Sequence, residues 1–189
     1  MSGDTRARVR VDRTDVGELM DPGRPEPATF VYAADVTERD AVSVTMPISH
    51  DAYRYDGLHP VFAQNLPEGY LGDILRRTVA KIHGAGDLTL LAALGRYQVG
   101  RVVVSRDTDA TMDTEAQDTK DDGESLQHLV DHGGPALFEE LVERYALRSG
   151  ISGVQPKVLV PALSGERATL RTSGFIVKSW SDDFPQLAA

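Results

Sequence analysis

Polar and apolar residues alternate in two segments of the first half of the chain, residues 6–12 and residues 41–46. Between them, residues 28–33 form a short run of aromatic and β-branched side chains. Both patterns are typical of β-strands. The segment between residues 12 and 28 contains Asp21-Pro22-Gly23 and Pro25-Glu26-Pro27, which are typical of turns. Proline fixes φ there, and glycine allows a positive φ. The pattern therefore predicts three strands in a small antiparallel sheet.

Two helices are predicted after this sheet. Apolar residues recur at spacings of three and four over residues 71–82, which is typical of an amphipathic helix, and Gly84 is a plausible end for it. Asp87 is placed as the N-cap of a second helix over residues 88–94, with Gly95 at its C-terminal end. A strand pattern returns over residues 98–104.

The second half of the chain begins with a predicted helix over residues 135–147, because Pro135 suits the first turn of a helix. Its apolar stripe consists of Leu137, Phe138, Leu141, Val142 and Tyr145. Three strands are predicted after it, over residues 157–160, 167–171 and 175–180. The sequence thus predicts an α+β fold in two parts, residues 1–104 and 128–189, joined by residues 105–127.

Charge is concentrated in that joining segment. It holds eight acidic residues and two basic ones, in a chain of 189 residues with a net charge of −9. Because it has almost no large apolar residues, we expect a mobile acidic linker. A function of this segment as a nucleic-acid mimic is the less favoured alternative. The negative net charge also argues against direct binding of nucleic acid by the domain as a whole.

Composition excludes several classes of site and of protein. The chain has no cysteine, so it has no disulfide framework, no thiolate zinc site and no cysteine nucleophile. It contains no signal-like N-terminus and no apolar stretch of about 18–20 residues, the length that spans a membrane. We therefore expect a cytoplasmic protein with no membrane partner.

The main candidate for chemistry is the glycine- and serine-containing loop at residues 148–157, between the predicted helix and strand. Successive backbone N–H groups in such a loop can surround a phosphate, although a loop with two glycines can also be a plain tight turn. Lys178 ends the apolar strand that follows. Kinases place a lysine on such a strand to bind the α- and β-phosphates of ATP, whereas the alternative is an ordinary surface lysine.

Two other groups of polar residues are weaker candidates. His128 and His132 are four residues apart and could share a metal ion, but no third ligand is evident, so solvent-facing histidines are favoured. Asp51, Asp56 and His59 could form a metal or acid–base cluster, and a polar loop explains them equally well. We predict no metal site in the chain.

The ordered motifs resemble those of HipA-type serine/threonine kinases, the toxins of bacterial toxin–antitoxin modules. In the second half these motifs are the string Ser149-Gly150-Ile151-Ser152-Gly153-Val154-Gln155-Pro156-Lys157 and the string Ser173-Gly174-Phe175-Ile176-Val177-Lys178. In the first half they include Val16-Gly17-Glu18-Leu19, Ser43-Val44-Thr45-Met46-Pro47, Asn65-Leu66-Pro67-Glu68-Gly69 and Leu94-Gly95-Arg96. Tyr97 and Arg101 stand where the family more often has Asp and Ala.

The resemblance implies the N-terminal lobe of such a kinase, in which the second part forms the nucleotide-binding sheet. The residues implied to bind ATP are Ile151, Ser152, Gly153, Val154, Gln155, Pro156 and Lys178. The family phosphorylates a serine of its own loop. The usual position is Gly150 in this sequence, so Ser149 and Ser152 are the candidates.

The chain departs from the family after Leu187, where the kinases continue into a helical lobe with the catalytic and metal-binding residues. We therefore expect no catalytic residue in this chain, no activity from it alone, and use of ATP and Mg²⁺ only with a complete C-terminal lobe. The implied partners are that lobe or a HipB-like helix-turn-helix antitoxin, with an aminoacyl-tRNA synthetase as the implied substrate. The alternative is a non-enzymatic, antitoxin-like binding protein that docks on a separately encoded kinase.

Overall fold

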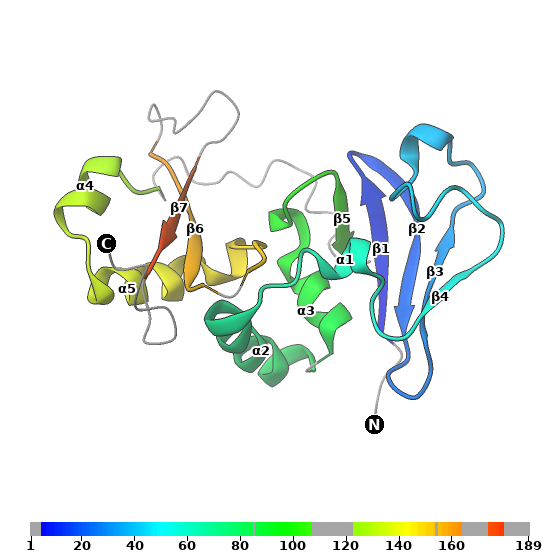
Figure 1. Ribbon diagram of the computed structural model, residues 1–189, viewed down its shortest axis with the longest axis horizontal. Coiled ribbons are helices and arrows are strands. Elements are labelled where there is room, and N and C mark those ends of the chain that lie inside the picture. The colour runs from blue at the N-terminus through cyan, green and yellow to red at the C-terminus, as the bar shows by residue number, and fades with distance from the viewer. Residues whose placement is uncertain (1–4, 85, 107–122, 154, 164–173, 180–189) are drawn as a thin grey trace. The chain divides into compact units, whose positions relative to one another are not determined.

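The computed structural model describes residues 5–84, 86–106, 123–153, 155–163 and 174–179 of the chain (Figure 1). The chain forms two compact units. Unit 1 comprises Met1–Leu66 and Arg76–Ala110, and unit 2 comprises Pro67–Leu75 and Thr111–Ala189. Helices and antiparallel strands occur in separate blocks along the chain, which confirms the predicted α+β class.

Unit 1 is built on a five-stranded antiparallel sheet in the order β4-β3-β2-β1-β5. The strands are β1 (Thr5–Val11), β2 (Thr14–Asp21), β3 (Ala28–Tyr32), β4 (Tyr53–Tyr55) and β5 (Val102–Ser105). The helical segments are η1 (Glu38–Asp40), α1 (Pro60–Ala63), α2 (Gly69–His83, which begins in unit 2), α3 (Asp87–Leu94) and η2 (Gly95–Tyr97). Among the described residues, no helix is long and apolar enough to cross a membrane.

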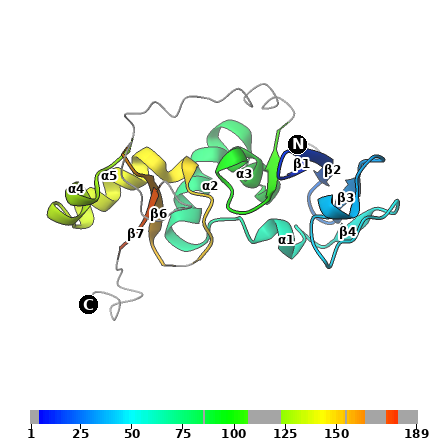
Figure 2. The ribbon, with the colours of Figure 1, turned by 90° about the horizontal axis from the view of Figure 1, so that it is seen from above.

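The core of unit 1 lies between the sheet and α3, which contacts β1 and β5 (Figure 2). Ala7, Val9 and Val11 alternate along β1 and are all buried, as the sequence predicts for a strand with one buried face. Helix α3 is apolar on almost every side and is buried from Leu88 to Ala92. Each large aliphatic side chain buried in this way contributes about 1.5–3 kcal/mol.

The prediction of a strand over residues 41–46 is wrong. The chain turns there, and the Met46 N–H donates to the Ser43 carbonyl over 3.0 Å. The Ser43 hydroxyl accepts a hydrogen bond from the Thr45 N–H, a local bond that competes with strand pairing. Val42 and Met46 are buried, but Val44 is 97% exposed between them, so the alternation marks a turn with two anchored ends.

Tyr32 holds both ends of this turn. Its hydroxyl donates to the Met46 carbonyl over 2.5 Å and accepts from the Val42 N–H over 2.9 Å. Burial raises the pKa of this phenol, because removal from water disfavours the charged form.

Strand β2 was not predicted, because its buried residues do not alternate. Val16 and Leu19 are three residues apart and both are buried. The pairing with β1 shifts between Val9 and Arg10, so that Val9 faces Gly17 and Arg10 faces Asp15. This β-bulge inserts one extra residue and changes the face to which the following side chains point.

Strand β5 begins at Val102, four residues later than predicted, because Gln98 has another function. Its side-chain Nε2 donates to the carbonyl oxygens of Leu91 (2.8 Å) and Val104 (2.6 Å). Its Oε1 accepts from the Val104 N–H over 3.1 Å. The buried amide therefore takes the place of a neighbouring strand at the outer edge of β5 and ties that edge to α3.

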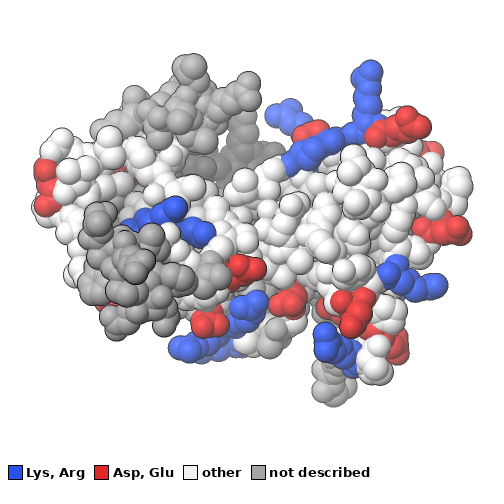
Figure 3. All heavy atoms as spheres, viewed as in Figure 1, with Lys and Arg blue, Asp and Glu red and all other residues white. Residues whose placement is uncertain are grey.

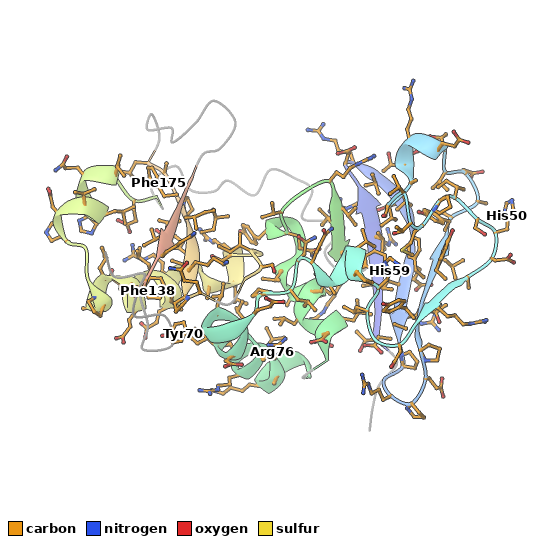
Figure 4. All side chains as sticks on the ribbon, viewed as in Figure 1. His50, His59, Tyr70, Arg76, Phe138 and Phe175 are labelled. Carbon is orange, nitrogen blue, oxygen red and sulfur yellow. The ribbon has the colours of Figure 1, made fainter. Side chains whose placement is uncertain are left out.

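Unit 2 contains a two-stranded antiparallel sheet of β6 (Lys157–Pro161) and β7 (Gly174–Lys178). Its helices are α4 (Leu126–Asp131), α5 (Pro135–Tyr145) and η4 (Ala146–Arg148). The buried stripe of α5 packs on β6, whose buried residues are Val158 and Val160. On α2, the Tyr70 ring lies next to Phe138 of α5, with 6.2 Å between ring centroids (Figure 4). The helix predicted from residue 135 and the strands predicted at 157–160 and 175–180 are confirmed. The strand predicted at 167–171 lies outside the described residues.

Ser149 connects the end of α5 to β6. Its hydroxyl is completely buried, donates to the Tyr145 carbonyl over 2.8 Å and accepts from the Leu159 N–H over 2.8 Å. Because the Leu159 carbonyl also lies 3.3 Å away, the hydroxyl occupies the outer edge of β6 much as Gln98 occupies that of β5.

Glu124 extends the same edge of β6. Its N–H donates to the Pro161 carbonyl over 2.9 Å, and its carbonyl accepts from the Leu163 N–H over 3.2 Å. Its carboxylate bonds Arg144 of α5 over 2.5 Å. The predicted linker, residues 105–127, therefore ends in residues that belong to the fold of unit 2, namely Glu124 and the first turn of α4. Residues 107–122 of that linker lie outside the described part of the chain.

Replacing Gln98 by Leu should destabilise unit 1 by about 2–4 kcal/mol, since the Val104 N–H and C=O would be buried without partners and the Leu91 C=O would keep only its bond from the Gly95 N–H. Urea denaturation followed by circular dichroism measures the change. Gln64→Leu is the matched control, because the Gln64 amide bonds the Val61 carbonyl at an exposed position. We expect the control to change stability by less than about 0.5 kcal/mol. Equal effects of the two variants would contradict the role given to Gln98.

Replacing Ser149 by Ala should destabilise unit 2 by about 1–3 kcal/mol, because the Tyr145 carbonyl and the Leu159 N–H lose their shared partner. Ser152→Ala serves as its control, since Ser152 is exposed in the same loop. Thermal unfolding of the two purified variants should show a lower midpoint for Ser149→Ala alone. A wild-type midpoint for that variant would show that water replaces the hydroxyl.

Candidate functional site

The glycine- and serine-containing loop is attached to the fold at both ends. At its start, the Ile151 N–H donates to the Ser149 carbonyl over 2.8 Å. At its end, the Ser179 N–H donates to the Pro156 carbonyl over 2.9 Å, which continues the β6–β7 pairing by one step. Gly150 and Pro156 are buried, whereas Ser152 is exposed. The loop is thus a surface segment held between the end of α5 and the last residues of β7.

Gly153 has a conformation that only glycine adopts without strain. Its φ is +118°, and a Cβ atom at this position would collide with the Nζ atom of Lys157. The Lys157 side chain therefore folds back over the loop backbone. Any larger residue at 153 would displace this side chain.

Lys157 and Lys178 are directly opposite each other in the antiparallel pairing of β6 and β7. Opposite residues of such a pair project to the same face of the sheet, with Cβ atoms about 4.5–5.5 Å apart. Leu159 and Ile176 form the next pair on this face, because side chains alternate along each strand. Ile176 is 56% exposed and Lys178 is exposed. We call these four residues the open face of the hairpin, and Figure 3 shows basic atoms over this region.

The open face combines two kinds of surface. Its apolar pair is Leu159 and Ile176, and its cationic pair is Lys157 and Lys178, at the end of the hairpin that adjoins the loop. Neither lysine has an ion-pair partner within the described ranges, and like charges placed opposite each other in a sheet repel. Such an arrangement can bind a ligand that is apolar at one end and anionic at the other.

The structure brings the residues implied by the kinase resemblance together at one end of the hairpin. The loop residues Ile151, Ser152, Gly153, Gln155 and Pro156 lead directly into Lys157, which faces Lys178. Val154 lies outside the described residues. Lys157 ends the quoted motif but was not among the residues implied to bind ATP, and its proximity to Lys178 depends on the register of the hairpin.

The two candidate phosphorylation sites differ in their surroundings. The Ser149 hydroxyl is buried and bonded to main-chain groups of α5 and β6. Ser152 is exposed next to Gly153. A protein kinase active site can therefore reach Ser152 in this conformation, whereas Ser149 would first have to leave the core.

Among the described residues, His128 of α4 and His132, the C-cap of that helix, have no third side chain with which to hold a metal ion. The rings of His128 and His132 lie 4.6 Å apart between centroids, and His128 Nε2 is 3.8 Å from a carboxylate oxygen of Glu124. Both histidines are exposed. Over the part of the chain that the structure describes, no group of three or more His, Asp or Glu side chains could hold a metal ion.

The polar residues at 51–59 also have structural partners. His59 is the N-cap of α1, where its Nδ1 accepts from the Val61 N–H over 3.3 Å, and its ring meets Tyr55 edge-on at 5.1 Å. Burial lowers the pKa of His59 (labelled in Figure 4). Asp56 lies 3.9 Å from Arg24, both at exposed positions. His59 and Asp56 thus have separate partners among the described residues.

Unit 1 has a surface hollow of about 470 Å³, between the turn at residues 41–48 and Arg101. Its lining is mostly apolar and includes Val42, Val44, Pro47 and Ile48. The Arg101 guanidinium donates to the Arg39 carbonyl over 2.5 Å and lies 3.4 Å from a carboxylate oxygen of Asp12. The hollow therefore offers a mostly apolar wall with two charged residues in its lining, Glu38 and Arg101.

Comparison with protein families gives a match to the HipA N-terminal domain over residues 7–105. The matched region is more than half of the chain and includes four strands of the unit 1 sheet in full and β1 from Ala7 onward. Comparison with curated proteins gives no match. On the strength of its matched sheet and helices, the chain belongs to the HipA N-terminal domain family.

Proposed function

We propose that unit 2 is the nucleotide-binding part of a HipA-like serine/threonine kinase N-terminal lobe, and that it binds ATP on the open face of the hairpin. The observation that carries this proposal is the pairing of Leu159 with Ile176 beside the pairing of Lys157 with Lys178, next to a glycine-containing loop. An apolar pair suits a nucleobase and a cationic pair suits phosphates. Membership of unit 1 in the HipA N-terminal domain family supports the kinase assignment.

Each part of the site has a separate contribution to binding. The apolar pair would cover one face of the adenine, and Lys178 would bind the α- and β-phosphates as a lysine does on the corresponding strand of kinases. The loop would cover the phosphates. Its backbone N–H groups could come close to the anion at glycine positions such as Gly153. The described residues therefore fit a nucleotide.

Phosphoryl transfer also requires groups that bind Mg²⁺ and orient the attacking hydroxyl. ATP, when bound with Mg²⁺, would supply the transferred phosphoryl group. We infer that a helical C-terminal lobe provides those groups. The resemblance implies a HipB-like antitoxin as the partner of the assembled kinase and an aminoacyl-tRNA synthetase as its substrate. We infer that the kinase binds both in the cytoplasm.

Ser152 is the phosphorylation site that we favour. It is exposed, and it precedes Gly153, over which the Lys157 side chain lies. A phosphate on Ser152 would add about two negative charges beside the cationic pair. It would compete there with the phosphates of ATP and so reduce nucleotide binding.

A second candidate function is that of an antitoxin-like protein that docks on a separately encoded kinase. The observation that favours it is the hollow of unit 1 with the 97% exposed Val44 at its wall, within the matched region. In this alternative unit 1 alone would bind the kinase, and Val44→Asp would weaken that complex without changing ATP binding by unit 2.

Lys178→Ala should lower the affinity of the chain for ATP by at least about tenfold, because a charge-assisted bond to phosphate is lost. Isothermal titration calorimetry of the whole chain measures this affinity. Lys81→Ala is the matched control, since Lys81 is an exposed lysine on α2. We expect both variants to keep the wild-type unfolding temperature. If wild type binds no ATP, or if both variants bind it equally, the hairpin is not a nucleotide site.

A further inference from the structure

We propose that the hollow of unit 1 is a self-complementary interface, on which a second copy of this chain docks about a two-fold axis. The residues of this interface all lie in unit 1, in its turn at residues 41–48, at Glu38 and at Arg101. The inference therefore goes beyond the proposed function, which concerns the hairpin of unit 2, and does not rest on it.

The turn presents one apolar side chain to solvent in a fixed position. Val44 is 97% exposed, although Val42 and Met46 on either side of it are buried. Both ends of the turn are bonded to the buried hydroxyl of Tyr32. Because the turn is already held in place, burying Val44 against a partner costs little conformational entropy. Val44 is thus preorganised for burial in an interface.

A surface that can bury Val44 lies beside it on the same molecule. The lining of the hollow is mostly apolar, and it includes Pro47, which is exposed, and Ile48, which is half-buried. A two-fold axis places the projecting side chain of each copy opposite the hollow of the other. One contact between copies would therefore remove two Val44 side chains from water.

The charges of the lining favour a second copy as the occupant. Glu38 and Arg101 are both exposed. The Arg101 contacts with the Arg39 carbonyl and the Asp12 carboxylate both use Nη2, so Nη1 can donate to a further carboxylate. A two-fold axis pairs Glu38 of each copy with Arg101 of the other, which gives two opposite-charge pairs. A partner with charges of one sign would instead place a like charge against one of these residues.

Sedimentation velocity of the whole chain over a series of protein concentrations measures the dissociation constant of the dimer. We expect wild type to dimerise and Val44→Asp to raise this constant by at least about tenfold, because two carboxylates would enter apolar surroundings. Val130→Asp is the matched control, since Val130 is a 68% exposed valine on α4 of unit 2, and it should leave the constant unchanged. Should Val44→Asp fail to fold, Val44→Ser replaces it, with an increase of at least about threefold.

Charge reversal tests the reciprocal pairing. Glu38→Arg should raise the dissociation constant by at least about fivefold, because it places a cation against Arg101 of the other copy. Adding Arg101→Glu to this variant restores opposite charges in both pairs. The doubly reversed chain should therefore recover most of the lost affinity, and thermal unfolding of each variant confirms that it is folded.

Three results would overturn the inference. A chain that stays monomeric at every concentration leaves the hollow to the separately encoded kinase of the second candidate function. A dimer on which Val44→Asp has no more effect than Val130→Asp has its interface elsewhere. A doubly reversed variant that dimerises no better than Glu38→Arg shows that the charge pairs do not form. The affinity for ATP should be the same in all of these variants, so none of these results bears on the proposed function.

Discussion

Both units depend on one kind of interaction. A buried polar side chain that follows a helix in the sequence completes the hydrogen bonding of an edge strand. Gln98 joins the Leu91 carbonyl of α3 to both main-chain groups of Val104, and Ser149 joins the Tyr145 carbonyl of α5 to the main chain of Leu159. Strand edges and helix ends both leave unsatisfied polar groups, and burying these without partners is costly. One side chain satisfies both, so helix and sheet can pack with their polar groups paired.

In unit 2 this interaction also positions the candidate site. The glycine-containing loop starts at Ser149 and ends where β6 begins. The bond from Ser149 to Leu159 anchors the strand and so fixes which residues of β6 face β7. A slip of one residue would turn Lys157 and the apolar pair to the opposite face of the sheet. The placement of two cations beside two apolar side chains thus depends on a buried hydroxyl that is bonded to the main chain of one of these four residues, Leu159.

Local patterns in the sequence were sufficient for α5, β6 and β7 of unit 2, but not for α4 or for all of unit 1. The stripe of α5 and the apolar runs of β6 and β7 are periodic, so they could be read directly. Strand β2 is interrupted by a bulge, and the alternation around Val44 belongs to a turn held by Tyr32, a residue far away in sequence. The kinase resemblance made Lys178 a candidate for ATP binding. The opposition of Lys157 could be recognised only once the hairpin register was known, because pairing is a tertiary property.

Amide hydrogen exchange at Leu159 tests this account most directly. In a two-stranded sheet the alternation of the ladder directs the Val158 and Val160 amides toward β7 and the Leu159 amide away from it, to the Ser149 hydroxyl. The account predicts that the Leu159 amide is protected to the same degree as those of Val158 and Val160, with an opening free energy close to that of unit 2 as a whole. Exchange of Leu159 at the rate of an exposed edge strand, with its two neighbours protected, would contradict it.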